Sequence, residues 1–294
     1  LKRRWQLYLM LVLPLAYLII FCYVPMGGVI IAFKDYSIRG GIWGSDWVGF
    51  KHFINFFNTP DFFKLLRNTL ILSLYNLVIT FPMPIILALA VNELKSKAYK
   101  KVVQMVTYLP YFISTVVLVG TMKNIFSPRT GLINNIIALF GGPQTDFMGN
   151  PDLFRTMYVW SGVWQGMGYS AVIYIAALAN VDSAQVEASL MDGAGRFARV
   201  WHVDLPAILP TIVIQLILAV GSVMSLGYEK VFLMQNPVNT EVSEVISTFV
   251  YKRGIAGFQY SYAAAVGLFN SVVNLVLIAL ANVFAKKVGE TSLW

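Results

Sequence analysis

Residues 187–210 read EASLMDGAGRFARVWHVDLPAILP, a charged passage between two long apolar stretches of the chain. It contains both acids and arginines, two glycines at positions 193 and 195, and the pair Leu205-Pro206. Because its neighbours are so apolar, the passage is typical of a polar connection between two membrane helices. The fold therefore depends on how many apolar helices the chain contains and on which side of them this passage lies.

The composition predicts an all-α membrane protein. Of the 294 residues, 57% are hydrophobic and only 12% are charged, whereas soluble domains carry about 25% charged residues. The single cysteine, Cys22, excludes an intrachain disulfide. The two histidines, His52 and His202, are far apart and have no partner at ligand spacing, so we expect no metal site and no cofactor bound by this chain.

Six stretches are long and apolar enough to cross a bilayer, which takes about 20 residues. The first follows Lys2-Arg3-Arg4, but its apolar run is too long for a signal peptide and no small-residue cleavage site ends it. We therefore expect a retained helix, kinked at Pro14 and Pro25. The predicted spans are Tyr8–Phe33, Asn68–Val91, Val102–Ile125, Met157–Asn180, Ala207–Tyr228 and Tyr262–Ala285.

The distribution of basic residues predicts that both termini are cytoplasmic. With the N-terminus inside, the inner segments hold half of the 22 Lys and Arg residues in a much shorter total length than the outer segments. Short basic loops weigh most in the positive-inside rule. The inner basic residues are Lys2, Arg3, Arg4, Lys95, Lys97, Lys100, Lys101, Arg196, Arg199, Lys286 and Lys287. Topology thus explains the net charge of +8, and no nucleic-acid partner is implied.

The sequence shows no internal repeat and no low-complexity linker, which favours a single membrane domain. Within it we distinguish residues 1–66, the first transmembrane helix with its outer loop, from residues 67–294. The second part is predicted to be a five-helix core that contains the connection 181–206.

Several kinds of chemistry are missing from the sequence. The dipeptide Gly-Lys never occurs, so the chain has no P-loop for a nucleotide. It also lacks His-Glu-x-x-His and a Gly-x-Ser-x-Gly nucleophile motif. Proton-coupled carriers usually place an acid or a histidine at mid-membrane, and the predicted spans contain almost none. These absences argue against an enzyme and against an ion-coupled carrier.

Neutral polar side chains lie near the middle of the predicted spans instead. Gln165 and Tyr169 are four residues apart on one helix, and Gln215, Ser222 and Glu229 recur every seven residues. Such amides serve equally well to hold helices together or to bind sugar hydroxyls, because they both donate and accept hydrogen bonds. The candidate pathway residues are Asn76, Gln165, Tyr169, Gln215, Ser222, Glu229, Asn270 and Asn274.

The connection 181–206 is predicted to form two short helical pieces. Asp182 is a helix cap with Gln185 three residues on, and Gly193 ends the first helix because glycine adopts the left-handed conformation easily. A second piece begins near Gly195 and is expected to end near Leu205-Pro206, where Pro206 and Pro210 redirect the chain. An apolar stripe is expected to pack on the membrane helices, leaving the charged side chains for solvent or a partner. The stripe is Leu190, Met191, Ala194, Phe197, Ala198 and Trp201, and the charged residues are Glu187, Asp192, Arg196 and Arg199.

This connection resembles the EAA loop of the membrane subunits of binding-protein-dependent ABC importers. The family pattern reads Glu-Ala-Ala, two free positions, Asp-Gly-Ala, then Phe, Ile and Leu-Pro. In this chain Ser189 replaces the second Ala, Val200 replaces the Phe, and Val203 replaces the Ile. The matching positions, which the resemblance makes the coupling residues, are Glu187, Ala188, Ser189, Asp192, Gly193, Ala194, Leu205 and Pro206. The rest of the chain, including "YVPMGGVIIAFKDYS" and "YLPYFIS", looks like carbohydrate-uptake permeases, in the branch for oligosaccharides from complex polysaccharides.

The resemblance implies a type I importer permease with the EAA coupling helix on the cytoplasmic side, between helices four and five, in a bacterial plasma membrane. It implies a heterodimer with a second permease, a cytoplasmic ATPase dimer that binds ATP and Mg²⁺, and an extracellular substrate-binding protein. Glu187 would pair with a basic residue of the ATPase, and Gly193 would permit the bend. Membrane lipid surrounds such a chain, and the import of an oligosaccharide would follow alternating access.

Two alternatives stay open at this point. One is an ion-coupled secondary sugar carrier, and the other is a membrane enzyme acting on lipid-linked sugars, for which only Glu229 with Lys230 comes close to a site. The substrate is also open: the basic residues Lys123, Arg129, Lys252 and Arg253 are compatible with an acidic oligosaccharide such as a uronide or with contacts to the binding protein.

Overall fold

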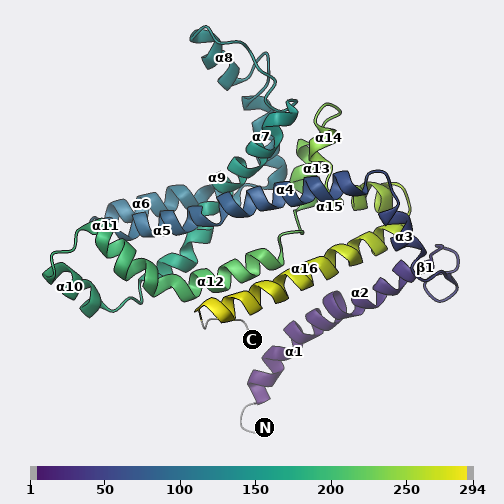
Figure 1. The fold of residues 1–294 in the computed structure, drawn as a ribbon, viewed down its shortest axis with the longest axis horizontal. Coiled ribbons are helices and arrows are strands. Elements are labelled where there is room, and N and C mark those ends of the chain that lie inside the picture. Colours follow the sequence, from purple (N-terminus) through teal and green to yellow (C-terminus); the bar gives the residue numbers. More distant parts are fainter. Residues whose placement is uncertain (1–4, 290–294) are drawn as a thin grey trace. The chain divides into compact units, whose positions relative to one another are not determined.

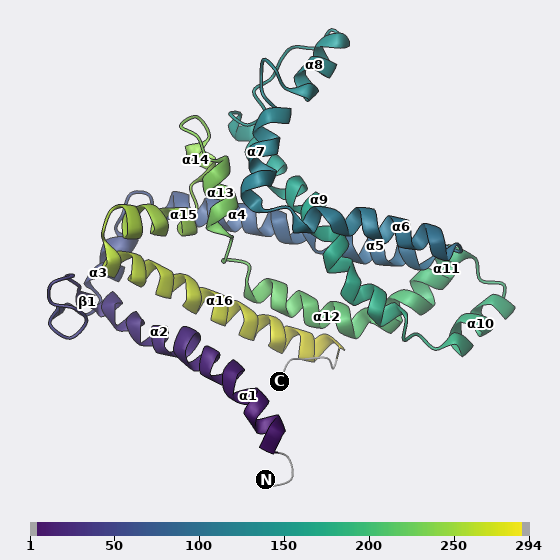
Figure 2. The same ribbon diagram turned by 180° about the vertical axis from the view of Figure 1, so that it is seen from behind.

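The computed structural model describes residues 5–289, so the basic cluster Lys2-Arg3-Arg4 lies outside the described residues. The described chain is mostly helical and forms two compact units (Figures 1 and 2). The first unit combines Leu1–Phe63 with Phe249–Val272, and the second combines Lys64–Thr248 with Val273–Trp294.

The first unit begins with a long apolar run whose helix type changes along its length. Pro14 lies inside α1 and Pro25 follows a π-helical turn, and the helical run continues past both prolines. At Pro25 the preceding π turn has already rearranged the backbone pairing. A short hairpin, which the all-helical prediction did not include, joins Lys34 to Trp47. The elements are α1 (Trp5–Leu18), η2 (Ile19–Tyr23), α2 (Val24–Met26), η3 (Gly27–Phe33), β1 (Lys34–Asp35), β2 (Asp46–Trp47), α3 (Lys51–Phe57), η6 (Tyr251–Ala256) and the first part of α16 (Tyr260–Gly289).

Aromatic contacts join the two sequence segments of the first unit. Phe56 is 1% exposed and packs edge-on against Tyr262 and Phe269 of α16. The backbone N–H of Tyr36 donates to Ser261 Oγ at 2.9 Å. These contacts explain why residues more than 200 positions apart form one unit, a grouping that the order of the sequence does not indicate.

The second unit contains the remaining helices, and its longest helix, α9, packs along α5 and also against α6 and α12 (Figure 1). Apolar residues of α4, α7, α9 and α13 form one core, and residues of α5, α9 and the start of α12 form another. The elements are α4 (Phe62–Thr80), α5 (Pro82–Asn92), α6 (Lys97–Tyr108), η4 (Leu109–Phe112), α7 (Thr115–Ile125), α8 (Leu132–Leu139), α9 (Pro151–Leu178), α10 (Ser183–Met191), α11 (Arg196–Arg199), η5 (Val200–Asp204), α12 (Leu205–Gly221), α13 (Tyr228–Met234), α14 (Thr240–Ser243) and α15 (Ile246–Val250).

Four helical runs of the described chain are long and apolar enough to cross a membrane, and a fifth does so if a bent pair of helices counts as one. The four are Tyr8–Phe33, Phe62–Asn92, Arg196–Gly221 and Tyr260–Lys287. They overlap the first, second, fifth and sixth predicted spans. The fourth predicted span forms α9, but α9 is not among these four, since polar side chains such as Gln165 and Ser170 interrupt its apolar sequence.

Two of the predicted spans are wrong as continuous helices. The third, Val102–Ile125, is broken: Lys97–Phe112 and Thr115–Ile125 meet at 98°. Pro110 lies in the 3₁₀ turn that ends the first piece, and Ser114 caps the next by accepting from the N–H of Val117. The fifth was expected to reach Tyr228, but α12 ends at Gly221 and Tyr228 begins α13.

Asn68 of α4 fastens the chain around residues 241–246. Its fully buried Nδ2 donates to the carbonyls of Glu241 at 2.7 Å and Glu244 at 3.1 Å. The adjacent Thr69 accepts from the N–H of Ile246 at 3.0 Å. Because buried backbone groups need partners, these two side chains replace helix or sheet pairing for this segment.

Replacing Asn68 with Ala should destabilise the protein by about 1–3 kcal/mol, because it leaves the buried carbonyl of Glu244 and the carbonyl of Glu241 without their donor. Chemical unfolding of the purified chain in detergent micelles measures the loss. The matched control is Asn180→Ala, because the side chain of exposed Asn180, in the turn after α9, donates only to the nearby carbonyl of Ala176. Equal stability of the two variants would contradict the role given to Asn68.

Candidate functional site

The connection 181–206 begins with the predicted cap and turn. Asp182 Oδ1 accepts from the N–H of Ala184 at 2.9 Å and starts α10. Gly193 has φ of 77°, the left-handed conformation predicted for it, and the N–H of Ala194 then donates to the carbonyl of Ser189 at 2.9 Å. Figures 1 and 2 show α10 at one end of the second unit, beyond α11.

The second helical piece does not end at Leu205-Pro206, so that part of the prediction is wrong. Arg196–Gly221 is one helical run, with a π-helical turn at Val200–Asp204 just before the proline. Pro206 falls in the first turn of α12, where a missing N–H is harmless, and the wider π turn accommodates the change in pairing. Leu205 and Pro206 therefore continue the helix.

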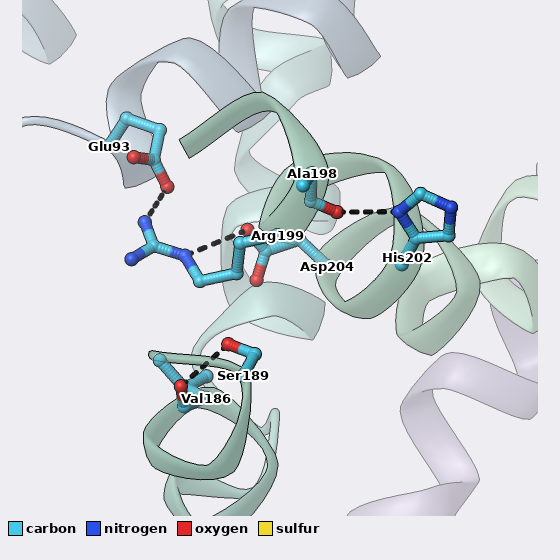
Figure 3. A network of polar contacts seen from close by, with 7 residues as sticks. All are labelled: Glu93, Val186, Ser189, Ala198, Arg199, His202 and Asp204. Atoms are coloured by element: carbon cyan, nitrogen blue, oxygen red, sulfur yellow. Dashed lines mark hydrogen bonds and ion pairs between the residues drawn. The ribbon is translucent and has the colours of Figure 1, made fainter. Parts of the chain in front are cut away.

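Arg199 is engaged inside the protein, in contrast to the expectation that it is left for solvent or a partner (Figure 3). Its guanidinium pairs with the carboxylate of Glu93, the residue that caps the C-terminal end of α5. Its Nε lies 3.9 Å from Asp204 Oδ2, and the Asp204 side chain is 3% exposed. The cluster of Glu93, Arg199 and Asp204 therefore links the stretch 181–206 to the end of α5.

The apolar stripe of the connection does not pack on the membrane helices as expected. Met191 is 89% exposed and Phe197 is 92% exposed, on either side of the Gly193 turn, and Leu190 and Trp201 are also exposed. Glu187, earlier in α10, and Asp192, beside Met191, are also exposed. A charged and apolar surface of this kind, presented on a short helix with no covering in the described chain, is suited to contact another protein.

A cavity of about 790 Å³, lined by apolar side chains and several neutral polar ones, lies in the second unit, and a smaller one of about 340 Å³ shares several of its lining residues. The larger volume is within the range of small-molecule sites, about 300–1,000 Å³. Five of the eight predicted pathway residues line these cavities: Asn76, Gln165, Tyr169, Gln215 and Ser222. The side-chain amides of Asn76 and Gln215 have no hydrogen-bond partner among the described residues, so both are free to meet a solute.

Gln165 and Tyr169 also hold the break between α6 and α7. Gln165 Nε2 donates to the carbonyl of Ile113 at 2.7 Å, and the rings of Tyr169 and Tyr111 stack at 3.9 Å between centroids. The carbonyl at a helix break needs such a donor when water is absent. Gln165 and Tyr169 therefore line a cavity and also stabilise the packing of α9 against the break between α6 and α7.

The other predicted pathway residues lie elsewhere. Glu229 does not share a helix with Gln215, because α12 ends first, and it is exposed on α13 outside both cavity linings. Asn274 accepts from the N–H of Met224 at 3.0 Å and donates to Ser225 Oγ at 2.8 Å, so it holds the turn after α12. Asn270 belongs to the part of α16 in the first unit and lines neither cavity.

Two charged residues of the site were not selected from the sequence. Glu93 precedes a loop rich in lysine and carries no motif, and Lys230 stands out in the sequence only as the neighbour of Glu229. Lys230 is the only charged residue that lines either cavity in the part of the chain that the structure describes. A lysine directly before the apolar residues 231–234 is the one feature of the sequence that could have indicated this position. Its place opposite α9 is not predictable from the sequence.

Comparison with known proteins gives a consistent result over the whole chain. Residues 80–290 match the family model described as the binding-protein-dependent transport system inner membrane component. Protein LplB of Bacillus subtilis (strain 168) is 48% identical, over 100% of this chain and 92% of its own. The polygalacturonan/rhamnogalacturonan transport system permease protein YteP of the same organism is 46% identical, over 98% of this chain and 90% of its own.

Solved structures agree with the sequence relatives. A chain in the crystal structure of a bacterial ABC transporter involved in the import of the acidic polysaccharide alginate superimposes with a TM-score of 0.90 at 38% identity. The match covers 98% of this chain and 97% of that one. A second crystal structure, with an alginate pentasaccharide-bound periplasmic protein in the complex, matches with the same score.

The match of family model, relatives and structures, together with several apolar helices, establishes a multi-pass membrane protein and a transport component rather than an enzyme. The chain belongs to the family of inner-membrane components of binding-protein-dependent transport systems, the permease subunits of ABC importers.

Proposed function

We propose that this chain is one pore-forming half of an ATP-driven importer for acidic oligosaccharides derived from complex polysaccharides. The observation that carries the proposal is a cavity into which the unpartnered amides of Asn76 and Gln215 open, in a chain whose coupling stretch is exposed. The relatives named for polygalacturonan/rhamnogalacturonan and the neighbour that imports alginate support an acidic sugar. An ion-coupled carrier is disfavoured, because neither cavity lining contains an acid or a histidine among the described residues.

In the proposed topology the chain crosses a bacterial plasma membrane six times, with both termini in the cytoplasm. The bent pair Lys97–Phe112 and Thr115–Ile125 makes one crossing, and α9 makes another. With 28 residues, α9 is about 42 Å long, which exceeds the roughly 30 Å of a bilayer core. Its lower apolarity is consistent with a helix that faces a polar pathway instead of lipid.

The proposed complex contains a second permease, a cytoplasmic ATPase dimer and an extracellular substrate-binding protein. This chain binds no cofactor of its own, and ATP with Mg²⁺ belongs to the ATPase. In this scheme α10 and the Gly193 turn form the cytoplasmic coupling element. Glu187 faces a basic residue of the ATPase, and exposed Met191 and Phe197 enter its groove.

Movement of the coupling element would reach the cavity through charged contacts. Arg199 is held to Glu93 at the end of α5, and Asp204 lies against the same guanidinium. Pro84 of α5 and Phe81, just before it, line the larger cavity. A displacement of α11 is therefore passed to one wall of the pathway, as alternating access requires.

Replacing Gly193 with Val should uncouple ATP hydrolysis from uptake, with several-fold less sugar imported per ATP. A Cβ at Gly193 would meet no neighbouring atom within 4 Å, so the penalty is the left-handed backbone, about 1–2 kcal/mol for a side chain with a Cβ. Uptake and phosphate release are measured together in proteoliposomes. Gly193→Asn, which tolerates this conformation, is the matched control. Normal coupling in the Val variant would contradict the coupling role of the turn.

Replacing Gln215 with Leu should lower uptake several-fold while ATP hydrolysis stimulated by the binding protein is retained, since an unpartnered cavity amide is lost. Asn274→Leu removes an amide that holds the Met224–Ser225 turn and should instead lower stability, by about 1 kcal/mol for each lost hydrogen bond. Uptake assays and unfolding in detergent separate the two effects. Unchanged uptake in the Gln215 variant would argue that the cavity carries no solute.

The purified chain alone should hydrolyse no ATP above the background of empty vesicles, because its sequence contains no P-loop. Adding the ATPase subunit should restore hydrolysis, measured as released phosphate. Robust turnover by the chain without its partner would refute the proposed division of labour.

A further inference from the structure

Lys230 occupies a fixed position on the wall of the smaller cavity. Its neighbours in α13, Val231 and Met234, are 0% and 2% exposed and are anchored in the apolar core that includes Tyr158. Lys230 Nζ donates to the carbonyl of Tyr158 at 2.9 Å and lies 4.7 Å from the centre of the Tyr158 ring. The ammonium is thus placed by a packed helix and by a hydrogen bond, and it does not move freely at the end of a side chain.

The opposite helix leaves space for this ammonium. Gly162 lies one turn after Tyr158 in α9, and a Cβ at Gly162 would come within 3.2 Å of Lys230 Nζ. The other polar residues of the smaller cavity are neutral, among them Asn76, Thr80 and Gln165. Asn76 and Thr80 also line the larger cavity, so the cation lies beside the space that would hold the sugar.

The charge of Lys230 has no counter-ion among the described residues. Its ammonium has three N–H donors, one of which is used by the Tyr158 carbonyl. Burial lowers the pKa of Lys230 to about 8, so the protonated form still predominates at neutral pH. A half-buried cation without a counter-ion is unfavourable, and an anionic group in the cavity would relieve that penalty while accepting from the donors that the Tyr158 carbonyl leaves free.

We propose that Lys230 is a specificity-determining residue of the translocation pathway, which receives the carboxylate of a uronate residue as the oligosaccharide passes. The free amides of Asn76 and Gln215 would meet its hydroxyls. The inference rests on the proposed import of acidic oligosaccharides and adds the residue at which acidity is recognised. It also gives a reason for a lone charge in a pathway that is otherwise neutral.

The test uses the complete importer, with partner permease, ATPase and binding protein, in proteoliposomes. The probes are an oligogalacturonide of defined length and the same oligomer with methyl-esterified carboxylates. Lys230→Met should reduce uptake of the acid about tenfold and change uptake of the ester less than twofold. Lys230→Arg should stay within about twofold of the wild type for the acid, because it keeps the charge. Each rate is divided by the wild-type rate for the same sugar, which cancels the preference of the unchanged binding protein.

Two further variants guard against a structural explanation. Lys230→Gln is neutral but keeps a donor for the Tyr158 carbonyl, and it should lose acid uptake as the Met variant does. Lys101→Met removes an exposed lysine of α6 outside both cavities and should behave as the wild type. Binding-protein-stimulated ATP hydrolysis should persist in all variants and shows that the complex assembles.

The outcomes separate the inference from the proposed function. Acid uptake at the wild-type rate in Lys230→Met or Lys230→Gln, equal loss of acid and ester, or an Arg variant as impaired as the Met variant would overturn the role of Lys230. Each of these results leaves an importer that works in its wild-type form. If the wild-type complex imports neither sugar in the presence of ATP, the proposed function itself fails. The comparison of the Arg and Met variants needs only the acidic sugar.

Discussion

The close approach of α9 to α6 is the constraint on which the cavity depends. At Gly168 the backbone of α9 lies so near the carbonyl of Thr107 that there is no space for a methyl group. Gln165 and Tyr169 flank this contact on α9, which brings them against Ile113 and Tyr111 at the break after α6. The break thereby gains a hydrogen-bond donor and a stacking partner, and the chain turns by 98° beside the cavity. A larger residue at Gly168 would separate the helices and remove both contacts.

The sequence predicts where the helices lie better than where they stop. Apolar length identifies the runs that begin near Tyr8, Phe62 and Tyr260, because burial in lipid needs nothing beyond the run itself. Pro110 and Ser114 mark the break near Ile113 locally, but the hydrogen bond that satisfies the Ile113 carbonyl comes from distant Gln165. The turn after Gly221 likewise depends on distant Asn274, which accepts from the N–H of Met224. An apolar sequence that passes through both positions contains no local sign of either partner.

The connection 181–206 shows the same division between local and distant effects. The Asp182 cap and the Gly193 turn are predictable, since each is decided by hydrogen bonds and backbone angles within a few residues. The ion pair of Arg199 with Glu93 crosses more than 100 positions and is not predictable from spacing. The exposure of Phe197 is not predictable for a related reason. An apolar stripe indicates that a surface is covered, but it does not indicate whether this chain or a partner covers it.

The two walls of the cavity belong to different parts of the helix packing, which bears on how a bound sugar could be released. The α5 wall is joined to the coupling stretch through Glu93 and Arg199, and separating that pair would leave the largely buried Glu93 carboxylate without its only described cation. The wall that carries Lys230 is anchored in the core formed with α7 and α9. A movement passed from the coupling stretch would therefore displace the α5 wall relative to the cation. Pro84 of α5 lines both cavities, so this displacement would change the space beside Lys230 and weaken binding without any change in the charge itself.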